Sequence, residues 1–139
     1  MKMVSVIIPY YNSECTIIRA LESVSTQTFT DFDIILVDDG STDNSHIIVD
    51  DYIKNHEGID FKHYYQENAG PSEARNLGIS KSDAEHIAFL DSDDSWVSDK
   101  LEIQIKLMEE NKIDLLGSNI NIVGKNGKVV QKYYSKRQL

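Results

Sequence analysis

The chain has 139 residues, of which 40% are hydrophobic and 27% charged, as in an ordinary globular protein with one domain and a real core. Its 14 basic and 23 acidic residues give a net charge of −9, which argues against broad contact with nucleic acid. The single cysteine, Cys15, forms no internal disulfide, so we expect a reducing, cytoplasmic location. No apolar run approaches the ~20 residues of a membrane span, which leaves peripheral contact with the cytoplasmic membrane face open.

The first half of the chain alternates β-branched runs with helical patterns. Three strands are predicted: Val4–Ile8 closed by Pro9, Phe32–Val37, and Asp60–Gln66. Apolar residues at helical spacing predict a helix after each of the first two strands. The expected N-caps are Asn12 or Ser13 for the first helix and Ser41 or Thr42 for the second.

The second half continues the alternation. Pro71 is expected to open a helix that Gly78 ends. The run Ile87–Leu90 predicts a fourth buried strand, and a helix to about Asn111 should follow it. Beyond that we expect a short strand at Asp114–Gly117 and a hairpin between residues 122 and 130 with its turn at Asn126-Gly127. Strands alternating with helices indicate an α/β, Rossmann-like fold with a mainly parallel central sheet and helices on both faces.

Three carboxylates, Asp91, Asp93 and Asp94, come directly after the fourth strand. Carboxylates are costly to bury and repel one another unless a cation lies between them. Hard oxygen ligands of this kind suit Mg²⁺ or Mn²⁺. The cluster therefore predicts a metal site at the carboxyl end of a strand, and the alternative is a solvated acidic turn.

Ligands of parallel sheets bind outside the carboxyl ends of the strands. Three polar motifs fall there: Tyr10-Tyr11-Asn12, Asp38-Asp39 and Asp91-Ser92-Asp93. This convergence favours a shared ligand site over three unrelated, solvent-exposed loops. A ring at Tyr10 or Tyr11 can stack on a nucleobase, although a tyrosine is often only core packing.

The charged residues of these motifs suggest distinct contacts. Asp38 or Asp39 can accept hydrogen bonds from a base or a ribose, against the alternative of turn chemistry beside Gly40. Since Asp39 lies at a strand end, we expect it to contact ligand and to have little role in packing. Asp91 can hold a ribose while Asp93 reaches a metal between two phosphates. Arg75, in the first turns of a helix, is a candidate diphosphate or loop-ordering contact, against the alternative of a surface salt bridge.

The chain resembles the family 2 glycosyltransferases from about Val4 to Asn121. Four segments occur in the family's order and spacing: Val4-Ser5-Val6-Ile7-Ile8-Pro9-Tyr10-Tyr11-Asn12, Val37-Asp38-Asp39-Gly40-Ser41-Thr42-Asp43, Asn68-Ala69-Gly70-Pro71-Ser72-Glu73-Ala74-Arg75-Asn76-Leu77-Gly78 and Asp91-Ser92-Asp93-Asp94-Ser95-Trp96. The resemblance implies a nucleotide-diphospho-sugar transferase fold of the A type and an inverting transfer. One departure is Ser98, where many relatives carry proline before the next helix.

The resemblance also implies residue roles. Tyr11 and Asp39 match the nucleobase contacts. Asp91 and Asp93 match the Asp-x-Asp pair, with Asp93 on Mn²⁺ or Mg²⁺. Arg75 matches the arginine of the middle loop. The remaining nucleotide-binding positions implied are Pro9, Asp38 and Ser92.

The function implied is transfer of a sugar from a nucleotide-diphosphate donor, expected to be a UDP-sugar, to a glycan or lipid-linked acceptor in surface polysaccharide synthesis. Residues 1–139 are expected to form one nucleotide-sugar-binding domain that stops before the acceptor-binding half. The general base is expected beyond Leu139, so we expect donor binding without transfer.

Two alternatives stay open on the sequence. A phosphatase of the haloacid dehalogenase type would use Asp91 and Asp93 as nucleophile and acid/base pair, but its motif normally opens the chain and is followed by a further acidic pair. A non-catalytic nucleotide-sugar-binding module would share every binding motif.

Overall fold

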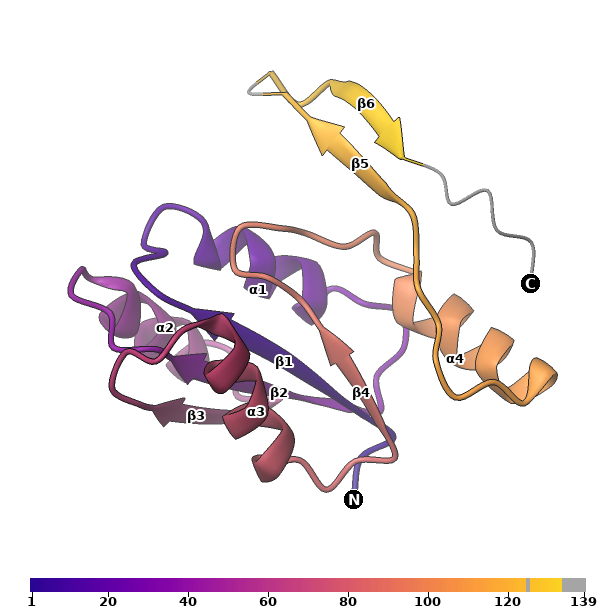
Figure 1. The fold of residues 1–139 in the computed structure, drawn as a ribbon, viewed down its shortest axis with the longest axis horizontal. Coiled ribbons are helices and arrows are strands. Elements are labelled where there is room, and N and C mark those ends of the chain that lie inside the picture. Colours follow the sequence, from indigo (N-terminus) through magenta and orange to yellow (C-terminus); the bar gives the residue numbers. More distant parts are fainter. Residues whose placement is uncertain (125, 134–139) are drawn as a thin grey trace. The chain divides into compact units, whose positions relative to one another are not determined.

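A four-stranded parallel sheet forms the centre of the computed structural model, which describes residues 1–124 and 126–133. The strand order is β3-β2-β1-β4, with bounds β1 Val4–Tyr10, β2 Phe32–Asp38, β3 Asp60–Tyr65 and β4 His86–Phe89 (Figure 1). The helices that alternate with them are α1 Ile17–Ser25, α2 Ser45–Lys54, α3 Pro71–Lys81 and α4 Lys100–Asn111. The predicted α/β fold with a mainly parallel sheet is confirmed.

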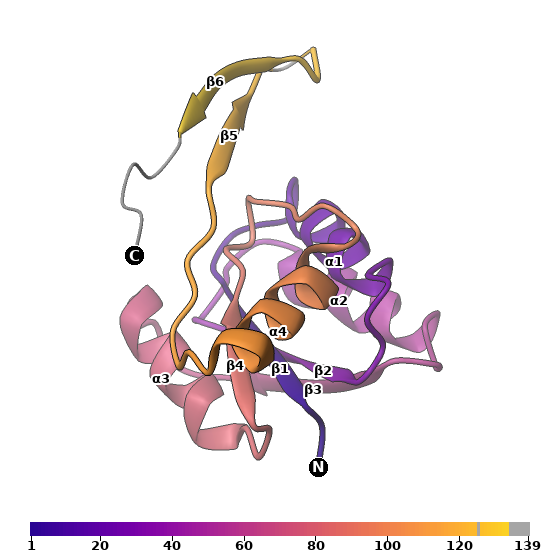
Figure 2. The same cartoon turned by 90° about the vertical axis from the view of Figure 1, so that its right-hand side faces the viewer.

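The two central strands are buried along their whole lengths because helices cover both faces of the sheet. Figures 1 and 2 place α3 on one face and α1 with α2 on the other. On the α3 side, Ile7, Ile35 and Val37 pack with Ala74. On the other side, α1 buries one apolar stripe: Ile17, Ala20, Leu21 and Val24.

Helix α3 begins at Pro71 as predicted but does not end at Gly78, because it continues to Lys81. Gly78 instead marks the closest approach of α3 to the sheet. A Cβ atom at this position would lie 2.5 Å from Cγ2 of Ile7. The glycine therefore serves packing between helix and strand, and the expected stop signal was wrong.

Strand β4 is not fully buried as the run Ile87–Leu90 predicted. Ile87 is 39% exposed and Phe89 is 45% exposed, although Leu90 just beyond the strand is buried. The register pairs Phe89 with Ile7, which places the side chains of Ile87 and Phe89 on the α3 side of the sheet. Helix α3 packs mainly on β1 and β2 there, and these two side chains of β4 stay partly exposed.

The expected N-caps are not observed. Helix α1 begins at Ile17 and α2 at Ser45, and neither has a capping hydrogen bond from the side chain of the residue before it. Asn12 and Ser13 instead use their side chains to contact other loops at the carboxyl edge of the sheet. Competition from these contacts explains why the sequence signal for a cap was misleading.

The chain divides into two compact units, Met1–Ile103 and the residues from Gln104 onward. The second unit contains an antiparallel hairpin of β5 Ile120–Val123 and β6 Val129–Tyr133. Gly127, with φ of +75°, occupies its turn, so the predicted hairpin is confirmed, although Lys125 and residues 134–139 lie outside the described residues. None of the described helices combines the length and hydropathy needed to cross a bilayer.

The predicted end of α4 at Asn111 is confirmed, but the predicted strand at Asp114–Gly117 is wrong, since no strand forms between α4 and β5. Leu115 in this stretch is exposed. A short apolar run becomes a strand only when a neighbouring strand pairs with its backbone, and this run has no such pairing among the described residues.

Candidate functional site

Loops after β1, β2, β3 and β4 meet at the carboxyl edge of the sheet. Asn12 joins the first two loops: its Oδ1 accepts hydrogen bonds from the backbone N–H of Thr42 at 2.8 Å and of Asp43 at 3.2 Å. Its own N–H donates to Oγ of Ser41 at 3.1 Å. Asn12 has a φ of +48°, a left-handed conformation that asparagine tolerates better than most residues. Sequence reasoning treated Asn12 as a helix cap and missed this role.

The two tyrosines at the end of β1 have different environments. Tyr10 is buried, and its hydroxyl lies 2.7 Å from Nε2 of His63, whose Nδ1 lies 3.0 Å from Oδ1 of Asp50. Burial, followed by the nearby charge of Asp38, raises the pKa of Tyr10 well above its usual value, so the hydroxyl keeps its proton while it is hydrogen-bonded with His63. Tyr11 is 48% exposed. Of the two candidates for stacking on a base, Tyr11 therefore offers its ring.

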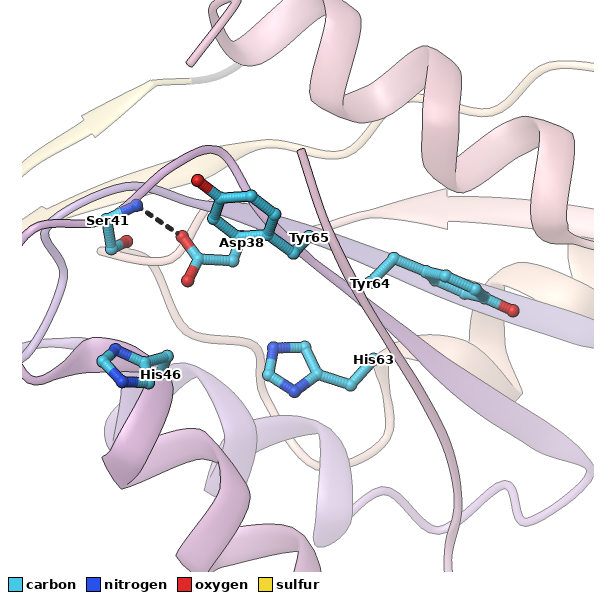
Figure 3. A pocket seen from close by; sticks show the side chains of 6 residues that line it. All are labelled: Asp38, Ser41, His46, His63, Tyr64 and Tyr65. Atoms are coloured by element: carbon cyan, nitrogen blue, oxygen red, sulfur yellow. Dashed lines mark hydrogen bonds between the residues drawn. The ribbon is translucent and has the colours of Figure 1, made fainter. Parts of the chain in front are cut away.

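A pocket of about 300 Å³ opens beside the end of β2. Figure 3 shows its lining side chains, which come from the β2 end, α2 and β3: Asp38, Ser41, His46, His63, Tyr64 and Tyr65. Asp38 is buried, and its Oδ1 accepts a hydrogen bond from the backbone N–H of Ser41 at 2.8 Å. Of the residues predicted to bind nucleotide, Asp38 is the one that lines this pocket.

Asp39 is only 3% exposed and organises the loop after β3. Its Oδ1 accepts from Nε2 of Gln66 at 2.7 Å and from the N–H of Ala69 at 2.9 Å, and its Oδ2 accepts from the N–H of Gly70 at 2.9 Å. The expectation that Asp39 has little role in packing was therefore wrong. A carboxylate has about four acceptor positions, and these three donors use three of them.

Gly40 allows the loops after β2 and β3 to touch. Its φ is +77°, and a Cβ atom at this position would lie 2.8 Å from the backbone nitrogen of Asn68. Nδ2 of Asn68 donates to the carbonyl oxygen of Asp39 at 3.0 Å. The Asp-Gly pair thus supports a specific contact between loops in addition to forming a turn.

The loop ordered by Asp39 leads directly into α3, which carries Arg75. Nη2 of Arg75 lies 2.5 Å from Oδ1 of Asp91, and both side chains are partly exposed. The ion pair brings a cation to the acidic cluster, and a partly exposed pair of this kind is also what the alternative of a surface salt bridge describes. A partly exposed pair contributes little stability, so its position matters more than its energy.

The three carboxylates of the acidic cluster lie on one exposed turn, which the N–H of Asp94 closes by donating to the carbonyl oxygen of Asp91 at 3.0 Å. Burial and the charges of Asp93 and Asp91 raise the pKa of Asp94, while Arg19 opposes the rise. Ser92 turns away from the cluster, with its Oγ 2.8 Å from Oγ of Ser13.

The donor set fits a metal that a ligand would share. Among the described residues, no group of three or more histidine, cysteine, aspartate or glutamate side chains is arranged to hold an ion alone. Mg²⁺ typically uses one or two protein carboxylates together with substrate phosphates and water. Asp91 is paired with Arg75, so Asp93 and Asp94 are the other exposed carboxylates of the cluster, and Asp93 is the one that the resemblance assigns to the metal.

The strand ends thus bring together most of the residues that the sequence singled out. Tyr11, Asp38, Asp39, Arg75, Asp91 and Asp93 all lie on the loops or helix at this edge. Pro9 is buried inside β1, beyond the last β1–β4 pair, and is placed for packing. Sequence reasoning missed Ser13 and Gln66, because only their partners in space reveal their roles.

Comparison with known proteins places this arrangement among relatives. The chain is 41% identical over 132 residues to an uncharacterized glycosyltransferase of Rickettsia felis, and this alignment covers 95% of this chain and 21% of that protein. It is 34% identical over 137 residues to WfgD of Escherichia coli, a UDP-Glc:alpha-D-GlcNAc-diphosphoundecaprenol beta-1,3-glucosyltransferase, with 99% of this chain and 53% of WfgD covered. The chain thus spans about a fifth and about half of the lengths of these relatives.

Solved structures show the same fold. S. aureus TarS 1–349 in complex with UDP-GlcNAc matches with a TM-score of 0.72 and 34% identity over 81% of this chain and 32% of that one. The mannosyltransferase PcManGT of Pyrobaculum calidifontis, in complex with GDP-Man and Mn²⁺, matches in fold with a TM-score of 0.73 at 24% identity, over 77% of this chain and 32% of its own. The family model for glycosyl transferase family 2 matches residues 5–137. The chain therefore belongs to glycosyl transferase family 2.

Proposed function

We propose that this chain forms the donor-binding part of an inverting, metal-dependent glycosyltransferase that takes a UDP-sugar and acts in surface polysaccharide synthesis. The acceptor would be a glycan or a lipid-linked saccharide. Support for the donor comes from TarS, which was solved with UDP-GlcNAc, and support for the acceptor comes from the name of WfgD.

The observation that carries the proposal is the physical linkage between the two ends of the site. Asp39, at the base end, holds the N–H groups of Ala69 and Gly70 immediately before α3. Arg75 of the same helix then pairs with Asp91 at the acidic end. An elongated ligand with a base at one end and phosphates at the other matches this arrangement.

Each residue then has a definite task. Tyr11 stacks on the uracil, and the uncommitted acceptor position of Asp39 receives its ring N–H. Asp91 holds the ribose hydroxyls, with its orientation fixed by Arg75. The guanidinium of Arg75 also lies where it can approach the diphosphate, because it sits near the N-terminus of α3, where anions are favoured.

Asp93 would hold Mn²⁺ or Mg²⁺ together with the phosphate oxygens of the donor. When bound, the metal offsets the charge that develops on the departing diphosphate. An acceptor hydroxyl would attack the anomeric carbon from the face opposite the diphosphate, and a base would take its proton. We assign that base to the acceptor-binding part of the protein.

Binding of nucleotides tests the proposal directly. UDP, GDP and ADP should be compared by thermal shift and calorimetry with Mn²⁺ and with EDTA. We expect UDP with Mn²⁺ to give the largest stabilisation, because a ligand stabilises a protein by RT ln(1 + [L]/Kd). Equal stabilisation by all three nucleotides, or by none, would count against a UDP-sugar donor.

A turnover assay separates an enzyme from a non-catalytic binding module. The full-length protein should be offered UDP-sugars with lipid-linked and free saccharide acceptors, and transferred sugar should be measured. We expect transfer by the full-length protein and donor binding without transfer by residues 1–139 alone. Donor binding by the full-length protein without any transfer would favour the binding module.

A further inference from the structure

Helix α1 and its flanks contact the acidic loop at several points that the donor contacts do not use. This loop, the acidic segment, comprises residues 91–98 and carries Asp91, Asp93 and Asp94. The contacts come from residues 13–28 and reach the beginning, the middle and the end of the acidic segment. They lie away from Arg75, which approaches the same segment from α3.

The end of the acidic segment is held by Gln27. This glutamine is 6% exposed, although glutamine is a residue type that usually faces water. Its Nε2 donates to the carbonyl oxygen of Val97 at 2.7 Å and to that of Ser23 at 2.9 Å. Its Oε1 accepts from the N–H of Leu101 at 3.0 Å. A buried amide that satisfies three backbone groups, two of them around the end of the segment, fixes that end against α1.

The backbone next to Gln27 strengthens the same attachment. The N–H of Thr28 donates to the carbonyl oxygen of Ser98 at 2.9 Å. Oγ1 of Thr28 lies 2.6 Å from Oε2 of Glu102, in the first turn of α4. The end of the acidic segment thus has contacts with two consecutive residues after α1.

The middle and the beginning of the segment are attached by other residues of the same region. The guanidinium of Arg19 donates to the backbone carbonyl oxygen of Asp93. Oγ of Ser13 bonds Oγ of Ser92 at 2.8 Å. Arg19 therefore holds the backbone of the residue whose carboxylate we assign to the metal, and it leaves that carboxylate free.

We infer that Gln27 is a positioning residue for metal-dependent donor binding: with Arg19, it fixes the backbone of the acidic segment so that the carboxylate of Asp93 faces the diphosphate site. This inference rests on the proposed function. Three carboxylates on one turn repel one another, so the turn would otherwise spread. Affinity falls in proportion to the fraction of molecules whose segment is correctly placed.

Two substitutions test the inference. Gln27→Met keeps the length and approximate volume of the side chain and removes all three amide hydrogen bonds. Arg19→Ala removes an exposed side chain, so it should leave folding intact even if the buried substitution does not. Tyr52→Phe is the matched control, because it removes the hydrogen bond from Tyr52 to Ser25 at the end of α1 and breaks none of the hydrogen bonds that hold the acidic segment.

Trp96 provides a local readout, since it is the only tryptophan of the chain and lies within the acidic segment. Quenching of its fluorescence by Mn²⁺ reports metal binding, and UDP affinity is measured with Mn²⁺ and with EDTA. Amide hydrogen exchange of the segment in the metal-free protein reports its order without any ligand. A segment that is ordered in only about a tenth of molecules gives about a tenfold higher Kd.

We expect Gln27→Met and Arg19→Ala to exchange faster at residues 92–98 and to raise the Mn²⁺-dependent UDP Kd about tenfold. UDP binding in EDTA should stay at the level of the unmodified protein, and Tyr52→Phe should change neither quantity. Unchanged Mn²⁺-dependent binding in Gln27→Met, or in Arg19→Ala if the former does not fold, would overturn the inference. Failure of the proposed function looks different, because the unmodified protein would then show no Mn²⁺-enhanced UDP binding.

Discussion

The substitution Asp39→Ala removes two roles that this carboxylate combines, which are ordering a loop and contacting the ligand. The side chain is almost completely buried and accepts three hydrogen bonds from Gln66, Ala69 and Gly70. Two of the donors are backbone N–H groups of the loop that leads into α3. Replacing Asp39 by alanine leaves both of them without their acceptor.

The expected cost follows from those two groups. A buried donor that loses its partner costs roughly 1–3 kcal/mol, and the lower half of that range applies because water can reach a loop at the sheet edge. Two such donors give a loss of about 2–4 kcal/mol in the free energy of unfolding. That is a large fraction of the 5–15 kcal/mol typical of a domain.

Urea unfolding measures this loss, and calorimetry with UDP and Mn²⁺ measures binding. Asp93→Ala is the matched control, because it removes the same charge from an exposed position. We expect Asp39→Ala to lose both stability and UDP affinity, and Asp93→Ala to stay within about 0.5 kcal/mol of the original stability. If Asp39→Ala also stays within about 0.5 kcal/mol, the loop-ordering role assigned to Asp39 is refuted.

Three further outcomes follow from the same structure. Asp93→Ala should abolish the Mn²⁺-dependent gain in UDP affinity, and excess EDTA should do the same to the unmodified protein. Equal UDP affinity of the unmodified protein in Mn²⁺ and in EDTA would contradict the metal site. Gly78→Ala should lower the free energy of unfolding, measured in urea, by about 1–3 kcal/mol, because the added methyl group would clash with Ile7. Alanine favours helices more than glycine does, so a gain in stability would contradict the close packing. Lys62→Met should cost about 3–5 kcal/mol, since the fully buried Asp33 would lose the Nζ that lies 2.8 Å from its Oδ2, and a cost below 1 kcal/mol would show that water reaches Asp33. The hydrogen bond with Asp33 raises the pKa of Lys62, so this stabilisation should be complete below about pH 10 and be lost only as pH rises through the folded-state pKa.

The hydrophobic pattern of the sequence was sufficient to predict the central strands of the sheet. The runs that became β1 and β2 are buried on both faces, and each is followed in the chain by a helix, so periodicity and packing agree. It was insufficient for β4, because burial of Ile87 and Phe89 depends on what covers the edge of the sheet and is not a property of the run itself. Asp114–Gly117 failed as a strand for the same reason, since pairing needs a partner.

Residue types at the strand ends indicated where the site lies but not the role of each residue within it. Tyr10 and Tyr11 are indistinguishable in the sequence, and only the contact with His63 shows that Tyr10 belongs to the interior. Gln27 carries no sequence signal for this role, because its two partners at the end of the acidic segment are backbone groups 70 and 74 residues away. Contacts between loops that are distant in sequence decide such roles.

The chain of contacts from Asp39 to Asp91 has a thermodynamic consequence. Asp39 holds the residues just before α3, and Arg75 of that helix holds Asp91 beside Asp93. Occupation of the base end should therefore restrain the metal end, and the two binding events become cooperative. Linkage then requires reciprocity: the factor by which Mn²⁺ tightens UDP equals the factor by which UDP tightens Mn²⁺. A carboxylate at the end of β2 would in this way influence how much free metal ion the protein needs before its donor is held.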